Sequence, residues 1–327
     1  MSISTPILVT GAAGYIGSHT TRLMKKMGYE PVGLDNLSTG FEESILNDMP
    51  LIRADAGDRD AVKAALLKYG IKDVIHFAGS VINSESIENP VLYYDNNTVQ
   101  TMHLAQVCAA NGVERFLYSS SAGVYGCNDK AILDEETPHN PLTPYGASKS
   151  MSERIIADIT ATSGMKYIAL RYFNVAGAAP EMGIGQRSQI STHILKIVCE
   201  ALTGKRDKIS IFGSDYPTPD GTCIRDYIHV LDLAEAHLAA LEYLAKGGES
   251  GAMNCGYGHG YSVREVIDAA LNATRQNIEV DEGARREGDP PSLVASNDRI
   301  CSLTGWAPKR DNLEQIILSA YEWEKTI

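Results

Sequence analysis

Short apolar runs alternate with amphipathic segments along the first half of the chain. Six such runs stand in order: PILVT (6–10), PVGLD (31–35), LIRAD (51–55), DVIHFAG (73–79), VERFLYSSS (113–121) and KYIALRYFN (166–174). Their length and apolar centres are typical of buried strands. The sequence therefore predicts a sheet of at least six strands.

Helical spacing fills the gaps between these strands. In 15–28 the residues Ile16, Thr20, Leu23, Met24 and Met27 share one face, and Gly28 ends the segment. Further helices are predicted over 59–70, over 88–112 with Asn89 as N-cap and Pro90 in the first turn, and after Tyr145. Strands that alternate with helices indicate a parallel sheet covered on both faces. We expect a doubly wound Rossmann-type α/β domain.

The pattern changes after about Asn174. Segments become shorter and richer in glycine, proline and charge, as in 213–227 and 282–292. This predicts a smaller α+β substrate-binding lobe over the carboxyl edge of the sheet. We expect a dinucleotide-binding domain in 1–175, to which 229–256 returns through a regular helix. The lobe then comprises 176–228 and 257–327.

Composition excludes several classes of protein. The 327 residues carry a formal net charge of -12, which disfavours nucleic acid and anionic membranes as partners. The six cysteines are dispersed and have no metal-ligand spacing with histidine, so we expect reduced thiols, no metal site and a cytoplasmic protein. The amino-terminal sequence lacks the basic region of a signal peptide, and no segment approaches the roughly 20 apolar residues of a membrane span.

A glycine-rich loop follows the first predicted strand. Gly11 permits a tight turn, Gly14 lets the backbone approach a pyrophosphate, and Gly17 allows close packing of helix on strand. The helix that begins here offers N–H groups and a positive dipole end to phosphates. Strand, loop and helix stand in the order that dinucleotide binding requires.

Two carboxylates at strand ends bear on the choice of cofactor. Asp35 ends the second strand, where a carboxylate can bind the adenosine ribose and repel a 2′-phosphate. Asn36 and Leu37 follow it, so no adjacent arginine compensates, and NAD is favoured over NADP. Asp55 ends the third strand; it either reaches the adenine or is a solvated strand end.

The candidate catalytic residues are Ser121, Tyr145 and Lys149. Ser121 closes a serine triplet at the end of the fifth strand, where the ligand crevice of such a sheet lies. Tyr145 and Lys149 are four residues apart and share one face of a helix. Such a pair alone is weak evidence, but here we expect the ammonium to lower the phenol pKa from about 10 toward neutrality. The phenolate could then take a proton from a substrate hydroxyl, shared with Ser121.

Taken together, the motifs resemble those of the extended short-chain dehydrogenase/reductase family over essentially the whole chain. The stretches that carry the resemblance are GAAGYIGSHT, LDNLSTG, VIHFAG, YYDNN, SSSAGVYG, PYGASK, LRYFN, DGTCIRDYIHVLDLA and RREGDPP. Within the family they are most similar to the UDP-sugar 4-epimerases. This resemblance implies a homodimer that interconverts UDP-galactose and UDP-glucose by transient oxidation at C4 with bound NAD, rotation of the 4-keto sugar and hydride return.

The resemblance also assigns roles to residues. Tyr145 is the base and acid, Lys149 its electrostatic partner and Ser121 the hydroxyl helper. The cofactor set is Gly11, Gly14, Tyr15, Ile16, Gly17, Asp35, Asn36, Asp55, Ala56, Phe77, Ala78, Asn96, Lys149 and Tyr172. The substrate set is Ser121, Tyr145, Asn174, His193, Phe212, Arg225, Arg286, Asp289 and Leu293.

Within the substrate set, the resemblance places Arg225 and Arg286 on the UDP pyrophosphate, Asp289 on the uridine ribose and the backbone near Phe212 on the uracil. It places Asn174 on the nucleotide sugar. From the residues alone, Arg225 could equally pair with Asp226 or Asp220 at the surface.

Three positions depart from the common pattern of these epimerases. Val81 stands where many members have a lysine, His193 where many have an asparagine that faces the hexose, and Leu293 where a tyrosine or cysteine gates the sugar 2-substituent. We interpret them as pocket lining, although His193 could also be a packed helix residue.

Related activities give alternative interpretations. Ala122 and Gly123 cannot transfer protons, which disfavours the nucleotide-sugar dehydratases and decarboxylases. A UDP-pentose 4-epimerase for xylose and arabinose, or a UDP-N-acetylhexosamine 4-epimerase, would use the same chemistry. A catalytically silent NAD-binding regulator is disfavoured because Ser121, Tyr145 and Lys149 are all present.

Overall fold

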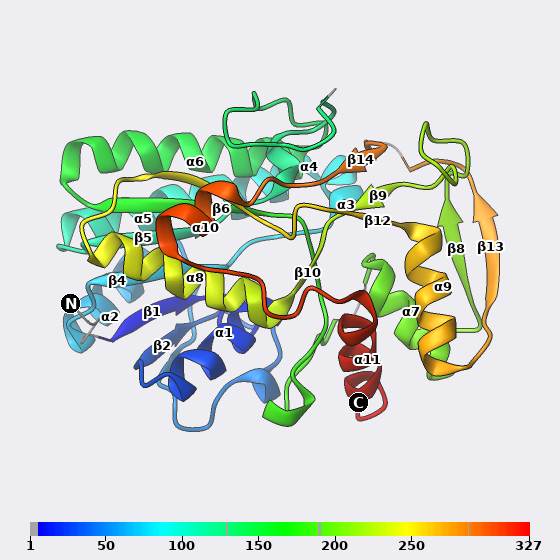
Figure 1. Cartoon of the computed structure of the whole chain (residues 1–327). Coiled ribbons are helices and arrows are strands. Elements are labelled where there is room, and N and C mark those ends of the chain that lie inside the picture. Colours follow the sequence, from blue (N-terminus) through cyan, green and yellow to red (C-terminus); the bar gives the residue numbers. More distant parts are fainter. Residues whose placement is uncertain (1–5, 129, 189–190, 287) are drawn as a thin grey trace.

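A parallel seven-stranded sheet forms the centre of the molecule in the computed structural model, which describes residues 6–128, 130–188, 191–286 and 288–327 (Figure 1). Its strands, in spatial order, are β11 (Gly251–Cys255), β6 (Lys166–Tyr172), β5 (Arg115–Ser119), β4 (Asp73–His76), β1 (Ile7–Thr10), β2 (Pro31–Leu34) and β3 (Leu51–Ile52). The order reverses between β1 and β4, which is the switch point where such sheets bind ligands. The predicted doubly wound fold is confirmed.

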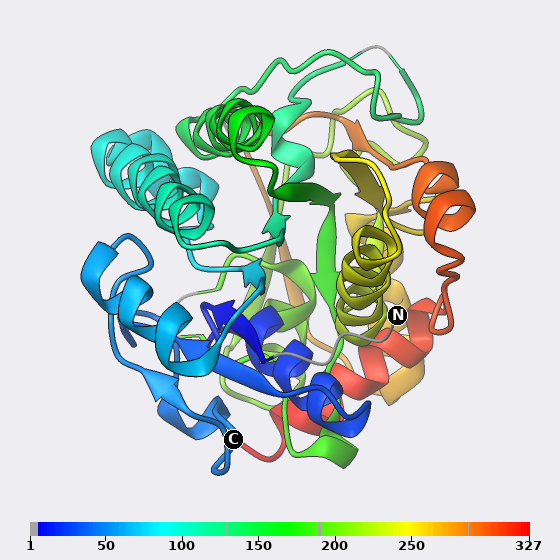
Figure 2. The same ribbon diagram turned by 90° about the vertical axis from the view of Figure 1, so that its left-hand side faces the viewer.

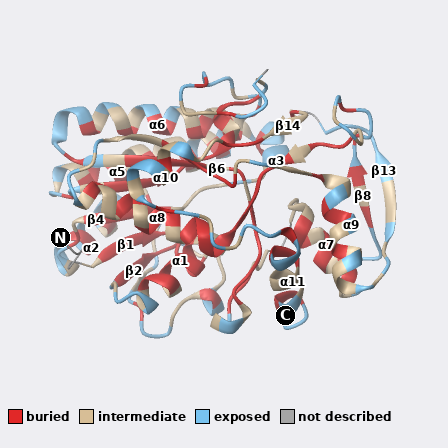
Figure 3. Cartoon of the chain, viewed as in Figure 1, coloured by how far each residue is buried: buried red, intermediate tan, exposed pale blue. Residues whose placement is uncertain are grey.

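Helices cover both faces of this sheet (Figure 2). Helices α1 (Tyr15–Lys26) and α8 (Val230–Ala245) pack on one face, and α2 (Arg59–Tyr69), α5 (Gln100–Ala110) and α6 (Pro144–Ser163) on the other. Along β1 the fully buried side chains alternate, Ile7 and Val9 toward one core and Leu8 toward the second. Figure 3 shows this burial on the central strands, as expected for a sheet enclosed in two layers.

Several predicted boundaries were wrong. Strand β3 has two residues, so Asp55 lies beyond it, and β5 ends at Ser119, so Ser121 lies in the turn that follows. Asn89 precedes a helix, but its side chain makes no capping hydrogen bond. The long helix predicted there comprises α4 (Pro90–Tyr93), a π-helical segment (Tyr94–Val99) and α5.

In its described residues the second lobe contains small sheets and three α-helices, drawn at the right of Figure 1. Its strands are β8 (Lys208–Phe212), paired with β13 (Glu279–Gly283), and β9 (Ile224–Arg225), which lies between β12 (Tyr261–Ser262) and β14 (Ser292–Leu293). Its helices are α7 (Ile194–Leu202), α9 (Val263–Thr274) and α11 (Leu313–Glu324). The parallel pair β7 (Asn174–Ala176) and β10 (Tyr227–His229) joins this lobe to the sheet.

The remaining elements are short. They are α3 (Asn83–Glu88), α10 (Asp298–Thr304) and the 3-10 turns Glu42–Ser44, Ala122–Val124 and Pro180–Met182. Helix α10 packs on α8 and β11, on the side of the central sheet, although 257–327 was expected in the lobe. Within the described residues, no helix is long and apolar enough to cross a bilayer.

Candidate functional site

The glycine loop after β1 is packed so closely that it excludes side chains. A Cβ atom at Gly11, whose φ is +69°, would lie 2.7 Å from the backbone nitrogen of Ala78. A Cβ at Gly17 would lie 2.1 Å from the Gly11 carbonyl oxygen. At Gly14 the nearest atom is that same oxygen at 3.3 Å. Gly11 and Gly17 are thus required for packing, and Gly14 has the room that a close ligand approach needs.

Helix α1 presents its amino-terminal end at this loop. Gly14 is its N-cap, no side chain caps it, and its first turn has no acidic residue. The N–H groups at Tyr15, Ile16 and Gly17 are therefore positioned to bind an anion. The Tyr15 phenol instead donates to the carbonyl of Gly177 at 2.5 Å.

Asp35 follows β2 and faces the same loop. It is 7% exposed, and its two carboxylate oxygens accept from the backbone N–H of Ala13 at 2.9 Å and of Leu37 at 2.8 Å. Nearby, the Asn36 amide donates to Asp55 at 2.5 Å. This fixed carboxylate beside an uncapped helix terminus fits the ribose and pyrophosphate of a dinucleotide.

Other predicted cofactor residues lie in the segments that border the loop. Phe77 and Ala78 directly follow β4, on the other side of the switch point, and Ala56 is buried. The Asn96 amide donates to the Ser80 hydroxyl at 2.8 Å, and the Tyr172 hydroxyl accepts from Ser119 at 2.9 Å. The predicted set is therefore gathered at the carboxyl edge of the sheet, and its contacts with a cofactor remain predictions.

Tyr145 begins α6 for local reasons. Thr143 is the N-cap and accepts from the N–H of Gly146, while Pro144 occupies the first helical position. Tyr145, Lys149 and Ser121 are at most 9% exposed. An added Cβ atom at Gly123 would lie 3.3 Å from the Ser121 hydroxyl oxygen and 3.6 Å from the Tyr145 ring, so these two side chains are neighbours. The structure thus brings the three predicted catalytic residues together.

Burial acts on the Tyr145 phenol against the predicted effect of Lys149. Burial raises the pKa of Tyr145, and the neighbouring Ser121 hydroxyl opposes this only in part. The Lys149 ammonium instead donates to the Ser119 carbonyl at 2.9 Å and lies 4.9 Å above the Tyr118 ring. Burial lowers the Lys149 pKa to about 8. In the chain by itself burial thus outweighs the expected lowering of the phenol pKa, and the effect of Lys149 in the NAD-bound site stays a prediction.

The predicted uridine and pyrophosphate residues lie together in the second lobe. Arg225 donates to Asp289 at 2.8 Å, rather than to Asp226 or Asp220. Leu293 on β14 is in register with Arg225 on β9. The Arg286 guanidinium stacks on the Phe212 ring, 4.1 Å from its centre. Two guanidinium groups and a carboxylate thus gather around short strands.

Two contacts connect the predicted UDP-binding residues of the second lobe with the catalytic residues. A Cβ at Gly288, next to Asp289, would lie 3.0 Å from the Thr143 methyl at the start of α6. Leu293 packs on a small core that includes Ala122, which follows Ser121. The segment that carries Asp289 and Leu293 therefore lies against Ser121 and the start of α6.

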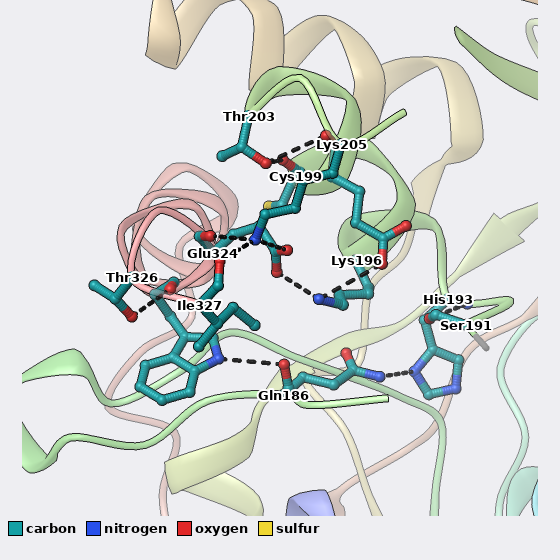
Figure 4. A network of polar contacts seen from close by, with 12 residues as sticks. Gln186, Ser191, His193, Lys196, Cys199, Thr203, Lys205, Glu324, Thr326 and Ile327 are labelled. Atoms are coloured by element: carbon teal, nitrogen blue, oxygen red, sulfur yellow. Dashed lines mark hydrogen bonds and ion pairs between the residues drawn. The ribbon is translucent and has the colours of Figure 1, made fainter. Parts of the chain in front are cut away.

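His193 lines a small cavity, and Asn174 lies next to one of its lining residues, Val175. The cavity measures about 20 Å³, room for about one water molecule, and lies behind β7, which Asn174 begins. His193 is the N-cap of α7, its ring lies 3.5 Å from the Gln186 amide, and burial lowers its pKa (Figure 4). This environment agrees better with the packed-residue alternative, and its contact with a hexose stays a prediction. The side chain of Val81, where many of the resembled epimerases have a lysine, is exposed.

Two residues were missed by the sequence reasoning. Asn97 is buried in the π-helical segment and bonds to both backbone groups of Ser80 and to Ser148, so it fixes the loop after β4. The buried hydroxyl of Tyr227 has no partner among the described residues, and it lies in the field of Arg225 and Asp289. The sequence does hint at a role for Tyr227: it stands two residues after Arg225 in an extended segment, where alternate side chains share a face.

Comparisons with known proteins agree with this geometry. The model of the NAD dependent epimerase/dehydratase family matches residues 7–256. The chain is 45% identical to a UDP-glucose 4-epimerase of Azospirillum brasilense, over 99% of this chain and 93% of that protein. The UDP-glucose 4-epimerase from Brucella ovis, solved in complex with NAD, gives a TM-score of 0.95 at 38% identity and covers 98% of this chain and 99% of its own. The UDP-Glc/GlcNAc 4-epimerase from Campylobacter jejuni gives 0.86 at 44% identity and covers 99% and 100%.

Proposed function

The chain belongs to the NAD dependent epimerase/dehydratase family, and we propose that it interconverts UDP-glucose and UDP-galactose by inverting C4. The observation that carries this proposal is the contact of two groups of residues. Ser121, Tyr145 and Lys149 lie beside the dinucleotide loop, and the segment bearing Asp289 lies against the start of their helix. The result is an isomerase without net oxidation.

NAD is the cofactor, and the glycine loop, the start of α1 and Asp35 would hold it. When bound, it would accept the C4 hydride, return it to the opposite face and add positive charge near the phenol. Tyr145 takes the proton of the 4-hydroxyl and gives it back, through its contact with Ser121. Lys149 holds its ammonium at Ser119, one turn along the helix from Tyr145.

The turn after Ser121 favours epimerisation over elimination. Ala122 and Gly123 follow Ser121 in a 3-10 turn, and neither has a side chain that transfers protons. A dehydratase needs a further acid and base at the sugar. The second lobe meets the other need of an epimerase, because Arg225, Arg286 and Asp289 can anchor the UDP while the hexose rotates.

A second candidate substrate is UDP-N-acetylglucosamine. The similarity to the Campylobacter jejuni UDP-Glc/GlcNAc 4-epimerase favours it. Against it, Leu293 offers no polar partner to an acetamido group, and an unsatisfied buried amide costs about 1–3 kcal/mol. We therefore propose the unsubstituted UDP-hexoses as the main substrates.

The assembly is proposed to be a homodimer. Helices α5 and α6 lie side by side, as Figure 1 shows, and several large apolar side chains near this layer are exposed. They include Val91 at 74%, Leu92 at 40% and Met151 at 47% exposed. The cytoplasm is the compartment that fits best, since all six cysteines are free thiols.

The decisive experiment is a product assay on the purified protein with UDP-galactose, UDP-glucose, their N-acetylated forms and UDP-xylose. We expect UDP-galactose and UDP-glucose to interconvert most efficiently. Tyr145→Phe keeps the ring but removes the proton acceptor, and it should lower kcat by about 10²-fold or more. A near-parental rate in Tyr145→Phe would contradict the role of this tyrosine, and a parent inactive on both hexoses would refute the proposed function.

A further inference from the structure

A third polar residue continues the face of α6 that bears the catalytic pair. Tyr145, Lys149 and Glu153 follow one another at four-residue intervals and therefore lie on the same side of the helix. All three are at most 8% exposed. The proposed chemistry uses the first two and leaves the buried Glu153 carboxylate without a role.

Glu153 is held by donors from two neighbouring strands. Arg171 on β6 donates to one carboxylate oxygen at 3.0 Å and to the other at 2.6 Å. The Ser120 hydroxyl, just after β5, donates to it at 2.5 Å. Arg171 is itself 6% exposed and also bonds to the Tyr125 hydroxyl. A bidentate, buried ion pair of this kind fixes the position of its carboxylate.

The same short segment after β5 also holds Lys149. The Ser119 carbonyl accepts from the Lys149 ammonium at 2.9 Å, and the next residue, Ser120, donates to Glu153. Two consecutive residues thus bind Lys149 and Glu153, one helical turn apart. Any shift of α6 along β5 would break both contacts at once.

We propose that Glu153 is a positioning residue for proton transfer: its carboxylate, fixed by Arg171 and Ser120, keeps Lys149 charged and in place beneath Tyr145. This inference rests on the proposed function of Tyr145 and Lys149. It assigns the Arg171–Glu153 pair a task that a purely structural ion pair would not have.

The charge balance around Lys149 supports the proposal. Burial lowers the pKa of Lys149 to about 8, and the negative charge of Glu153 is the interaction that opposes this. Without the carboxylate, the amine would lose its proton at a lower pH. A neutral amine could not favour the phenolate of Tyr145.

Other titratable groups, from the neighbouring elements, lie near Lys149 or Glu153. They are His76 on β4, Tyr118 on β5, Tyr167 and Arg171 on β6, and His139 in the loop before α6; Tyr172 on β6 interacts with Tyr145 instead.

None of these groups can replace Glu153. Burial lowers the pKa of His76 to about 3, so this ring is neutral in the working range of pH. Burial raises the pKa of Tyr118, of Tyr167 and of Tyr172, so these phenols are neutral as well. His139, 3.8 Å from the Glu153 carboxylate, has a pKa lowered by burial, and Arg171 is a cation.

The test is a titration of Lys149 that does not depend on activity. Protein labelled with ¹³C-lysine is titrated by NMR, and Lys149→Met identifies the signal by its loss. In Glu153→Gln, which keeps the size and hydrogen bonds of the side chain, the Lys149 pKa should fall by about one unit or more. The alkaline limb of the kcat/KM profile for UDP-galactose should move to lower pH by the same amount.

Two further variants make the result decisive. Glu153→Gln/Arg171→Met removes both partners of the ion pair, so it decides the matter if the single variant does not fold; a smaller fall in the Lys149 pKa is expected, because the Arg171 cation is removed with the carboxylate. Asp73→Asn breaks another buried ion pair, with Arg115 at the amino end of the sheet, and should leave the Lys149 titration unchanged.

The two proposals fail separately. An unchanged Lys149 pKa in a folded variant without the Glu153 charge would overturn the present inference, whatever the enzyme does. An equal shift in Asp73→Asn would do so too, because the effect would then be general. A parent that converts neither UDP-hexose would refute the proposed function, while the NMR titration would still decide the role of Glu153.

Discussion

Gly17 is the position in the dinucleotide loop that leaves least room for a side chain. An added Cβ atom would lie 2.1 Å from the Gly11 carbonyl oxygen and 2.9 Å from its carbonyl carbon. Both are backbone atoms and cannot rotate away. Since an ordinary contact is about 3.4 Å, α1 must move from the loop by about 1 Å in Gly17→Ala.

This displacement sets the expected magnitudes. Overpacking of this kind destabilises a fold by about 1–3 kcal/mol. For a chain of this length that corresponds to a fall in Tm of about 2–5 °C. The N–H groups of α1 move with the helix, and a misplacement of about 1 Å can weaken a preorganised site by about 10²-fold. Gly17→Ala should therefore lose NAD as well as stability.

The assay combines thermal unfolding of cofactor-stripped protein with the NAD content of protein as purified. Gly14→Ala separates the two effects, because its Cβ would meet only one atom, at 3.3 Å. It should lower the NAD content with little change in Tm. Gly251→Ala is the matched control, since nothing lies within 4 Å of its added Cβ. A Gly17→Ala protein with parental Tm and full NAD would refute the reasoning.

Three further predictions concern cofactor, assembly and substrate range. Purified protein should contain NAD, because the Asp35 carboxylate repels a 2′-phosphate; recovery of NADP from denatured protein would contradict this. Light scattering at micromolar concentration should give the mass of two chains, and Met151→Asp on the exposed side of α6 should shift it toward one. The ratio of kcat/KM for UDP-N-acetylgalactosamine to that for UDP-galactose should fall in Leu293→Tyr and rise in Leu293→Ser. An unchanged ratio in both variants would show that Leu293 is not the gate.

The parts of the site that sequence reasoning found are local in the chain. The strand, glycine loop and helix of 6–28 follow directly, and the spacing of Tyr145 and Lys149 fixes their common face. The π-helical segment was not predicted, and the contacts made from it are between residues far apart in the sequence. Asn97 has to reach Ser80 and Ser148, which lie 17 and 51 residues away.

Electrostatic behaviour was the least accessible from sequence. The pair Tyr145 and Lys149 suggested a lowered phenol pKa, but burial is the larger effect and is known only once the fold is known. Glu153 reads as an ordinary helix residue until Arg171 and Ser120 are seen beside it. Likewise, Arg225 finds its carboxylate 64 residues further on, at Asp289, and not at its sequence neighbours.

The Arg225–Asp289 pair also bears on how UDP could enter. The two side chains predicted to bind the pyrophosphate and the ribose bind each other in the structure, so a ligand must exchange this contact for its own. Asp289 is 34% exposed, which keeps the net contribution of the pair small, on the order of 1 kcal/mol or less. Arg225 is 9% exposed, and a phosphate would restore the charge partner that it loses. The pair thus holds the guanidinium in its buried position at little cost to binding, while Arg286, stacked on Phe212, remains exposed to the incoming ligand.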